Sequence, residues 1–156
     1  GPIYGVHAFV PRMIASGEPG HVVNTASTAG VVAFPGIASY DVAKQGVVAL
    51  SEVLLADAMA EKLPIRVSVL CPGVVRTKIG VSERNRPGGV KGDAFGEEGL
   101  ITATEAIEPE AVAQAVLRAI NDGTFWIMTH PRYVDLVKTR AEGMLTGAMP
   151  PIPHPI

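Results

Sequence analysis

Apolar residues recur along this chain at two spacings, and the alternation between the spacings predicts the order of the secondary structure. Spacings of three and four residues are typical of helices that bury one face, whereas short apolar runs bounded by turn residues are typical of strands. The first pattern predicts helices over residues 3–16, 39–62, 108–122 and 133–145. The second pattern predicts strands over residues 21–27, 65–71 and 124–129. Pro11 is expected to kink the first helix or to lie in its last turn.

Helices and strands that alternate in this way predict an α/β fold, in which a doubly wound, Rossmann-like parallel sheet carries helices on both faces. Three strands are few for such a sheet, because parallel strands need cover on both faces and neighbours at their edges. We therefore expect an incomplete sheet that belongs to a larger domain, with a small three-stranded domain as the alternative. Residues 1–147 are expected to form the catalytic portion of one domain, with a Gly-rich substrate loop at about 77–106. Residues 148–156 are expected to form an extended Pro-rich tail.

Composition narrows the classes of function. The chain has 156 residues, 47% of them hydrophobic and 18% charged, which is typical of a single globular domain. Its formal net charge of −2 argues against nucleic acid and anionic membranes as partners, since both call for a basic patch. No apolar run reaches the roughly 18 residues that span a bilayer. The single cysteine, Cys71, excludes an internal disulfide, and we predict a reducing, cytoplasmic location and no metal site.

Chemically active side chains follow the predicted strands at one edge of the sheet. Ser27 ends the first strand, the Pro72–Gly73 turn follows the second, and Tyr40 and Lys44 begin the helix between them. Ligands of open parallel sheets bind outside the carboxyl ends of the strands. A hydroxyl, a phenol and an ammonium can therefore converge there, although none is adjacent to another in sequence.

The four-residue spacing of Tyr40 and Lys44 places both side chains on one face of a helix. An ammonium about 4 Å from a phenol supplies about 4 kcal/mol at an effective dielectric of about 20. That is about the free energy needed to lower the pKa of a tyrosine phenol from about 10 to about 7. Tyr40 could then exchange a proton with an alcohol or ketone while Ser27 donates a hydrogen bond to the substrate oxygen. Taken singly, the same residues are ordinary: a tyrosine at the core edge, a lysine stem on apolar surface and a strand-end hydroxyl.

Three motifs together resemble the classical short-chain dehydrogenase/reductase family. They are NTASTAG at the end of the first strand, YDVAK with its tyrosine thirteen residues after Ser27, and CPGVVRT after the second strand. The resemblance covers about residues 1–130 and implies an NAD(P)-dependent oxidoreductase that interconverts a secondary alcohol and a ketone. It implies that Tyr40 is the acid/base, that Ser27 orients the substrate oxygen, and that Lys44 favours the ionised tyrosine and holds the nicotinamide ribose.

The same resemblance implies which residues contact NAD or NADP. The Pro72–Gly73 turn would shape the nicotinamide pocket, and the Val75 main chain and the Thr77 hydroxyl would reach the carboxamide. The complete implied set is Thr25, Ala26, Tyr40, Lys44, Pro72, Gly73, Val75 and Thr77. Apolar residues near these motifs are expected to line the substrate pocket and to favour a hydrophobic substrate: Ala29, Val31, Phe34, Ile37 and Val74.

The chain departs from the family in lacking the glycine-rich phosphate loop, the residue that selects NAD or NADP and an NNAG stretch. We therefore expect it to be the carboxyl-terminal portion of a family member, inactive by itself. One alternative function is a binding or scaffold protein that keeps the fold without turnover. Another is an epimerase or dehydratase of related fold.

The predicted helices 3–16 and 39–62 carry apolar residues beyond the stripe that one sheet face can cover. Phe9 on the first helix and Val53 on the second lie outside those stripes. Helices that are apolar over so wide an arc commonly pack on two sides. We therefore expect a homodimer or homotetramer that forms through these two helices, as the family resemblance also implies.

Overall fold

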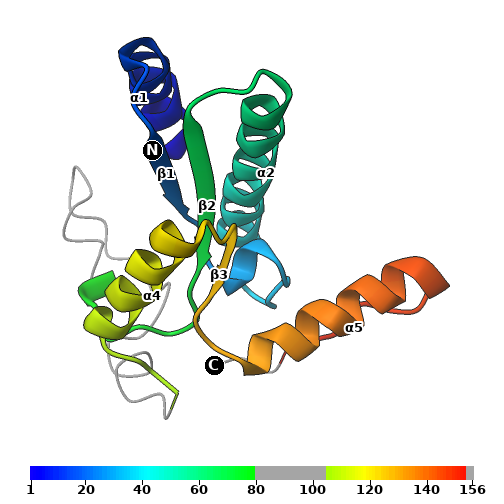
Figure 1. Cartoon of the computed structure of the whole chain (residues 1–156). Coiled ribbons are helices and arrows are strands. Elements are labelled where there is room, and N and C mark those ends of the chain that lie inside the picture. The colour runs from blue at the N-terminus through cyan, green and yellow to red at the C-terminus, as the bar shows by residue number, and fades with distance from the viewer. Residues whose placement is uncertain (80–104, 154–156) are drawn as a thin grey trace, which may run out of the picture.

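The computed structural model describes residues 1–79 and 105–153, and in these ranges it forms one parallel sheet with helices on both faces (Figure 1). The strands are β1 (Gly20–Thr25), β2 (Ile65–Cys71) and β3 (Trp126–Met128), in the order β1-β2-β3. Thr25 lies opposite Leu70, and Cys71 lies opposite Met128, so all three strands end at one edge of the sheet. The predicted α/β fold with a partial, Rossmann-like parallel sheet is confirmed.

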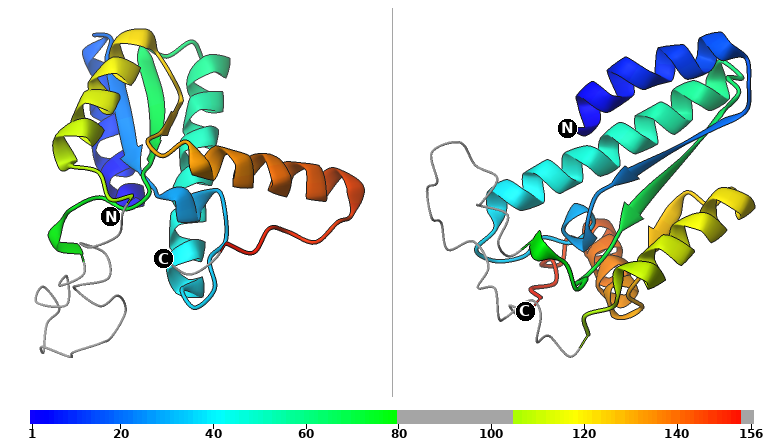
Figure 2. Two further views of the ribbon diagram at one scale, coloured as in Figure 1. Left: turned by 90° about the horizontal axis from the view of Figure 1, so that it is seen from below. Right: turned by 90° about the vertical axis from the view of Figure 1, so that its left-hand side faces the viewer.

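Alternate residues of β2 face opposite layers of helices. Helices α1 (Pro2–Ser16) and α2 (Ala38–Ala60) cover one face, and α4 (Pro109–Asp122) covers the other (Figure 2). Val67 of β2 packs with Val10 and Leu54 in the first layer. Leu70 packs with Ala119 of α4 in the second. The central strand is therefore buried on both sides, which explains its continuous apolar sequence.

Helix α5 (Arg132–Thr146) extends away from the sheet and packs on the body through residues of its first turns (Figure 1). Tyr133 is buried there against Phe34, and the Arg140 guanidinium donates a hydrogen bond to the Val31 carbonyl at 2.6 Å. After Gly147 the chain turns back, and residues 148–153 form no helix or strand.

Local sequence explains where most of the elements begin and end. Helices α1 and α4 both end at glycines with a left-handed backbone (φ 70°), Gly17 and Gly123, a conformation that glycine adopts without steric cost. Pro11 lies inside α1 without ending it, since the helix continues to Ser16. The first strand stops at Thr25, before the predicted end at residue 27, because the chain turns into a short 3₁₀ helix there. None of the helices in residues 1–79 and 105–153 is both long and apolar enough to cross a membrane.

Candidate functional site

Ser27 lies directly after β1 and caps the 3₁₀ helix η1 (Thr28–Gly30). Its hydroxyl oxygen accepts a hydrogen bond from the Ala29 amide at 3.2 Å. The same hydroxyl donates to the Pro72 carbonyl at 3.4 Å, and that carbonyl also accepts the Thr28 amide at 2.9 Å. The turn after β2 therefore holds the Ser27 segment, and the hydroxyl has one long bond that a better acceptor can replace.

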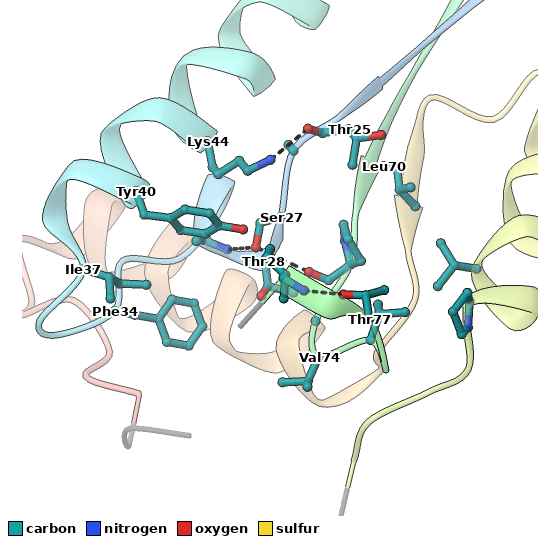
Figure 3. A pocket seen from close by; sticks show the side chains of 18 residues that line it. Thr25, Ser27, Thr28, Phe34, Ile37, Tyr40, Lys44, Leu70, Val74 and Thr77 are labelled. Atoms are coloured by element: carbon teal, nitrogen blue, oxygen red, sulfur yellow. Dashed lines mark hydrogen bonds between the residues drawn. The ribbon is translucent and has the colours of Figure 1, made fainter. Parts of the chain in front are cut away.

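Tyr40 and Lys44 lie on the first two turns of α2 and face the same space as Ser27. The Lys44 ammonium lies 5.6 Å from the centre of the Tyr40 ring and donates a hydrogen bond to the Thr25 carbonyl at 3.1 Å. Figure 3 shows the Tyr40 phenol pointing toward Ser27. The helix spacing of four residues thus brings the phenol, the ammonium and the hydroxyl to one place.

Burial shifts the pKa of two groups at this site, the Lys44 ammonium and the Cys71 thiol behind it. Partial desolvation lowers the pKa of Lys44 from its ordinary value, opposed by a smaller charge effect from Cys71. Burial raises the pKa of the Cys71 thiol from 9.0 to about 11, so this thiol is neutral at pH 7. We therefore take desolvation as the dominant influence on Lys44 at neutral pH, since a neutral thiol carries no charge to stabilise the ammonium.

A cavity of about 340 Å³ lies outside the carboxyl ends of β1 and β2 and is lined by Ser27, Tyr40 and Lys44. The other predicted cofactor contacts also line it: Thr25, Ala26, Pro72, Gly73, Val75 and Thr77. Four of the five predicted substrate-pocket residues do as well: Ala29, Phe34, Ile37 and Val74. The prediction for Val31 is wrong, because Val31 follows the 3₁₀ helix, packs into the core and presents its carbonyl to Arg140.

The sequence did not predict the part of the cavity lining that lies across from Ser27, Tyr40 and Lys44. Pro109 and Val112 from the first turn of α4 line the cavity, together with Ile79. Two further lining residues, Thr28 and Leu70, were also missed. The amphipathic pattern of α4 was a usable signal, since a helix that follows a strand crossover begins near the same end of the sheet.

The chain on either side of residues 80–104 is joined at a narrow neck. Val75 and Ile107 form an isolated parallel bridge, in which the Arg76 amide donates to the Ile107 carbonyl at 2.9 Å. The Arg76 guanidinium pairs with Glu108 at 2.8 Å, across the same bridge. This neck brings the start of α4 to the cavity. The prediction of a mobile substrate loop at about 77–106 falls mostly on residues 80–104, which lie outside the described residues.

Asn24 and Asp41 hold neighbouring segments without lining the cavity. The Asn24 amide donates to the Ser51 hydroxyl of α2 at 3.0 Å, because its side chain points into that helix layer. Asp41, next to Tyr40, accepts the Phe34 amide at 3.0 Å. Both residues therefore help to orient the segments that carry Ser27 and Tyr40.

Comparison with known proteins gives consistent matches. The family model described as short chain dehydrogenase matches residues 1–88. The chain is 29% identical to the CLA biosynthesis dehydrogenase/reductase of Lactiplantibacillus plantarum, over 96% of this chain and 56% of that protein. It is 37% identical to the 1-deoxy-11-beta-hydroxypentalenate dehydrogenase of Streptomyces avermitilis, over 82% of this chain and 42% of that protein.

A solved structure matches the fold closely. The short chain dehydrogenase/reductase from Burkholderia phymatum in complex with NAD superposes with a TM-score of 0.87 and 30% sequence identity. The match covers 99% of this chain and 58% of that one. The chain thus spans about half the length of the curated relatives and the solved structure that it matches.

The family match also corrects a prediction. The chain was predicted to be the carboxyl-terminal portion of a family member, with a resemblance over about residues 1–130. The family model is instead matched by residues 1–88, which are the amino-terminal part of this chain, and the prediction is withdrawn. The family itself is the one that the three motifs indicated. Since the matched residues make up more than half of the 156, this chain belongs to the short-chain dehydrogenase/reductase family.

Proposed function

We propose that the protein is an NAD(P)-dependent oxidoreductase that interconverts a secondary alcohol and a ketone. The observation that carries the proposal is the convergence of Ser27, Tyr40 and Lys44 on one cavity at the carboxyl end of the sheet. Membership of the dehydrogenase family supports the reaction class. Neither a scaffold protein nor a purely structural site needs these three side chains around one empty space.

Each of the three side chains has a separate role in this proposal. Tyr40 takes the hydroxyl proton of the alcohol during oxidation and returns it to the carbonyl oxygen during reduction. Ser27 exchanges its 3.4 Å bond to the Pro72 carbonyl for a bond to the substrate oxygen, where negative charge develops. Lys44, close to the Tyr40 ring, stabilises the ionised phenol.

The residues around the cavity suit a nicotinamide nucleotide. The ammonium of Lys44 has three N–H donors, and the Thr25 carbonyl occupies one, so others can reach a ribose hydroxyl. The Thr77 hydroxyl and the Pro72–Gly73 turn lie on the same lining. We assign cofactor contacts to the eight residues named from the sequence, all of which line the cavity. The nicotinamide, when bound, accepts or supplies the hydride.

The substrate is proposed to be hydrophobic. The part of the lining that lies beyond the three polar side chains carries no charged side chain: Phe34, Ile37, Val74, Ile79, Pro109 and Val112. A phosphorylated or carboxylated substrate would find no cation there other than Lys44 among the described lining residues. An alcohol on an apolar skeleton therefore fits best.

Subunit association through α1 and α2 is also proposed, as a homodimer or homotetramer. The large apolar side chains on these helices that are more than half exposed include Phe9, Val42, Val53 and Met59. A second copy of the same surface would cover them in a two-fold arrangement. Light scattering of the purified protein at micromolar concentration should show at least a dimer. A monomer that retains activity would contradict this assembly.

Exchange of Tyr40 for Phe tests the proposed reaction. We expect Tyr40→Phe to lower kcat on the order of 10²- to 10⁴-fold, because the ring stays while the proton-transferring group is lost. Formation of NADH or NADPH from hydrophobic secondary alcohols, followed by absorbance, measures the effect. Tyr4→Phe on the exposed face of α1 is the matched control and should retain activity. A Tyr40→Phe protein as active as the control would refute the proposal.

A further inference from the structure

His130 is a buried histidine behind the cavity that the proposed reaction does not use. It follows β3 and is 5% exposed. Its Nδ1 atom lies 3.1 Å from the Gly73 amide, and its Nε2 atom lies 3.1 Å from the Val74 carbonyl. The Nε2 atom also lies 3.2 Å from the Glu105 carbonyl, at the neck before α4.

These contacts fix the protonation of the ring. The Gly73 amide can only donate, so Nδ1 must be an unprotonated acceptor, and the single ring proton lies on Nε2. The Nε2–H group is then shared between the Val74 and Glu105 carbonyls. The Thr129 hydroxyl lies 2.8 Å from Nδ1 and donates a hydrogen bond to Nδ1. The imidazole thus accepts a hydrogen bond from the Gly73 amide and donates one to the carbonyl of the next residue, Val74. A ring that only filled space would need neither bond.

Packing holds the same turn against the ring. A Cβ atom at Gly73 would lie 2.8 Å from His130 Cγ and 2.8 Å from Tyr133 Cε2, so only glycine lets both rings come this close. The Tyr133 ring meets His130 edge-on at 6.0 Å between centres and meets Phe34 at 5.9 Å. Phe34 lines the cavity, so this row of rings runs from the back of the turn to the cavity wall.

The Pro72–Gly73 turn also holds the segment that carries Ser27. Pro72 precedes Gly73, and its carbonyl accepts both the Ser27 hydroxyl and the Thr28 amide. A shift of the Gly73 backbone therefore moves the Pro72 carbonyl, to which the backbone amide next to Ser27 stays bound. We propose that His130 is a positioning residue, which fixes the Pro72–Gly73–Val74 turn and thereby places Ser27 for the reaction. This inference rests on the proposed function for its effect on catalysis, and on the contacts above for its effect on the turn.

Two substitutions separate the polar contacts of His130 from its volume. His130→Phe keeps a ring but removes the acceptor for Gly73 and the donor for Val74. His130→Gln offers an amide oxygen and an amide N–H that can restore one contact of each kind. The matched control is His21→Phe, which removes the 2.7 Å contact between His21 Nε2 and the Ser68 hydroxyl, away from the cavity.

Kinetics and amide hydrogen exchange on the same purified proteins give the readouts. We expect His130→Phe to lower kcat on the order of ten- to a hundredfold, the cost of misplaced reacting groups, and to expose the Gly73 amide to exchange. His130→Gln should recover most of both. His21→Phe should lower the Tm while leaving kcat and the Gly73 amide as in the parent protein.

The inference is overturned if His130→Phe keeps the parent kcat, or loses kcat while the Gly73 amide stays protected. Should His130→Phe fail to fold, His130→Gln decides: a change in only one of kcat and Gly73 protection overturns the inference, and retention of both or loss of both supports it. Absence of any alcohol oxidation by the parent protein defeats the proposed function instead. The Gly73 amide alone then decides whether His130 fixes the turn.

Discussion

The two walls of the cavity are built by different forces. The polar wall, Ser27, Tyr40 and Lys44, is fixed by hydrogen bonds of the Ser27 and Lys44 side chains to backbone carbonyls at the ends of the strands. The apolar wall, Ile79, Pro109 and Val112, comes from the chain around the neck and from the start of α4. The side chains of the polar wall are bonded to the strand ends, whereas the apolar wall is held by the bridge, by the Arg76–Glu108 ion pair and by the packing of α4 on the sheet.

This difference separates reaction from substrate choice. The groups that move a proton must be held within small tolerances, and bonds to strand ends provide that precision. Apolar side chains select by shape and area, so a wall of them can change without touching the chemistry. We therefore expect substitutions on the polar wall to change kcat for every substrate, and substitutions on the apolar wall to change the preference among substrates.

Beyond the Tyr40→Phe exchange described above, the largest effect is expected from Ser27→Ala. Loss of the hydroxyl removes a hydrogen bond to the developing negative charge and should lower kcat about 10²- to 10³-fold for all alcohols alike. Ser16→Ala, at the exposed end of α1, is the control, because its hydroxyl bonds only local backbone. Steady-state kinetics with a small and a bulky alcohol make the measurement. A loss confined to one alcohol would place Ser27 with the apolar wall instead.

The thiol beneath the polar wall should make stability depend on pH. The pKa of Cys71 is raised from 9.0 to about 11 in the folded protein, so the unfolded chain loses this proton first. Its contribution to stability is therefore complete below pH 9 and is lost as the pH rises toward 11. A two-unit shift corresponds to about 3 kcal/mol.

Urea unfolding of the parent protein and Cys71→Ala at pH 7, 9 and 10.5 measures this contribution. The lowered pKa of Lys44 acts with the opposite sign, favouring folding as the pH approaches 10.5, and it is present in both proteins. The difference in free energy of unfolding between the two proteins should therefore shrink as the pH rises above 9. A constant difference across this range would show that the thiol does not titrate as described.

The smallest effect is expected from Val112→Ala on the apolar wall. Removing two methyl groups from the lining should lower kcat/KM for a bulky alcohol about tenfold and leave a small alcohol nearly unchanged. Val116→Ala is the matched control, because Val116 lies one helical turn further along α4 in the same apolar cluster but outside the cavity lining. Equal losses of kcat/KM for both alcohols in Val112→Ala would show that the apolar wall does not determine substrate preference.

The sequence predicted the residues of the polar wall, but it did not predict the residues that hold the turn behind that wall. Strand β2 was predicted with its observed bounds, because Pro64 and the Pro72–Gly73 turn mark both ends. Ser27, Tyr40 and Lys44 were predicted to lie at one edge of the sheet because strand ends and helical spacing carry a local signal, and all three line the cavity. His130 contacts Gly73 across 57 positions, and a single histidine has no periodicity from which such a contact could be read.

Short-range geometry was the other source of error. Val31 was assigned to the cavity as an apolar residue near the motifs, but after the 3₁₀ turn its side chain packs into the core. Strand β3 is only Trp126–Met128 rather than 124–129, and part of the chain before it bonds a side chain of β2 instead of its backbone. The Thr124 carbonyl, for example, accepts the Ser68 hydroxyl at 2.6 Å. Such side-chain partners have no counterpart in an apolar pattern.

The neck formed by Val75, Arg76 and Ile107 has a consequence for how this site can be diversified. It gives the segment between these residues two closely spaced ends, joined by the Val75–Ile107 bridge. The entropic free-energy cost of closing a segment between fixed ends grows only with the logarithm of its length, by about 0.6 kcal/mol for each doubling. Segments of other lengths and compositions can therefore be grafted between the same two ends while the sheet and its polar side chains stay in place. The neck is thus the point at which a change in chain length would disturb the sheet least.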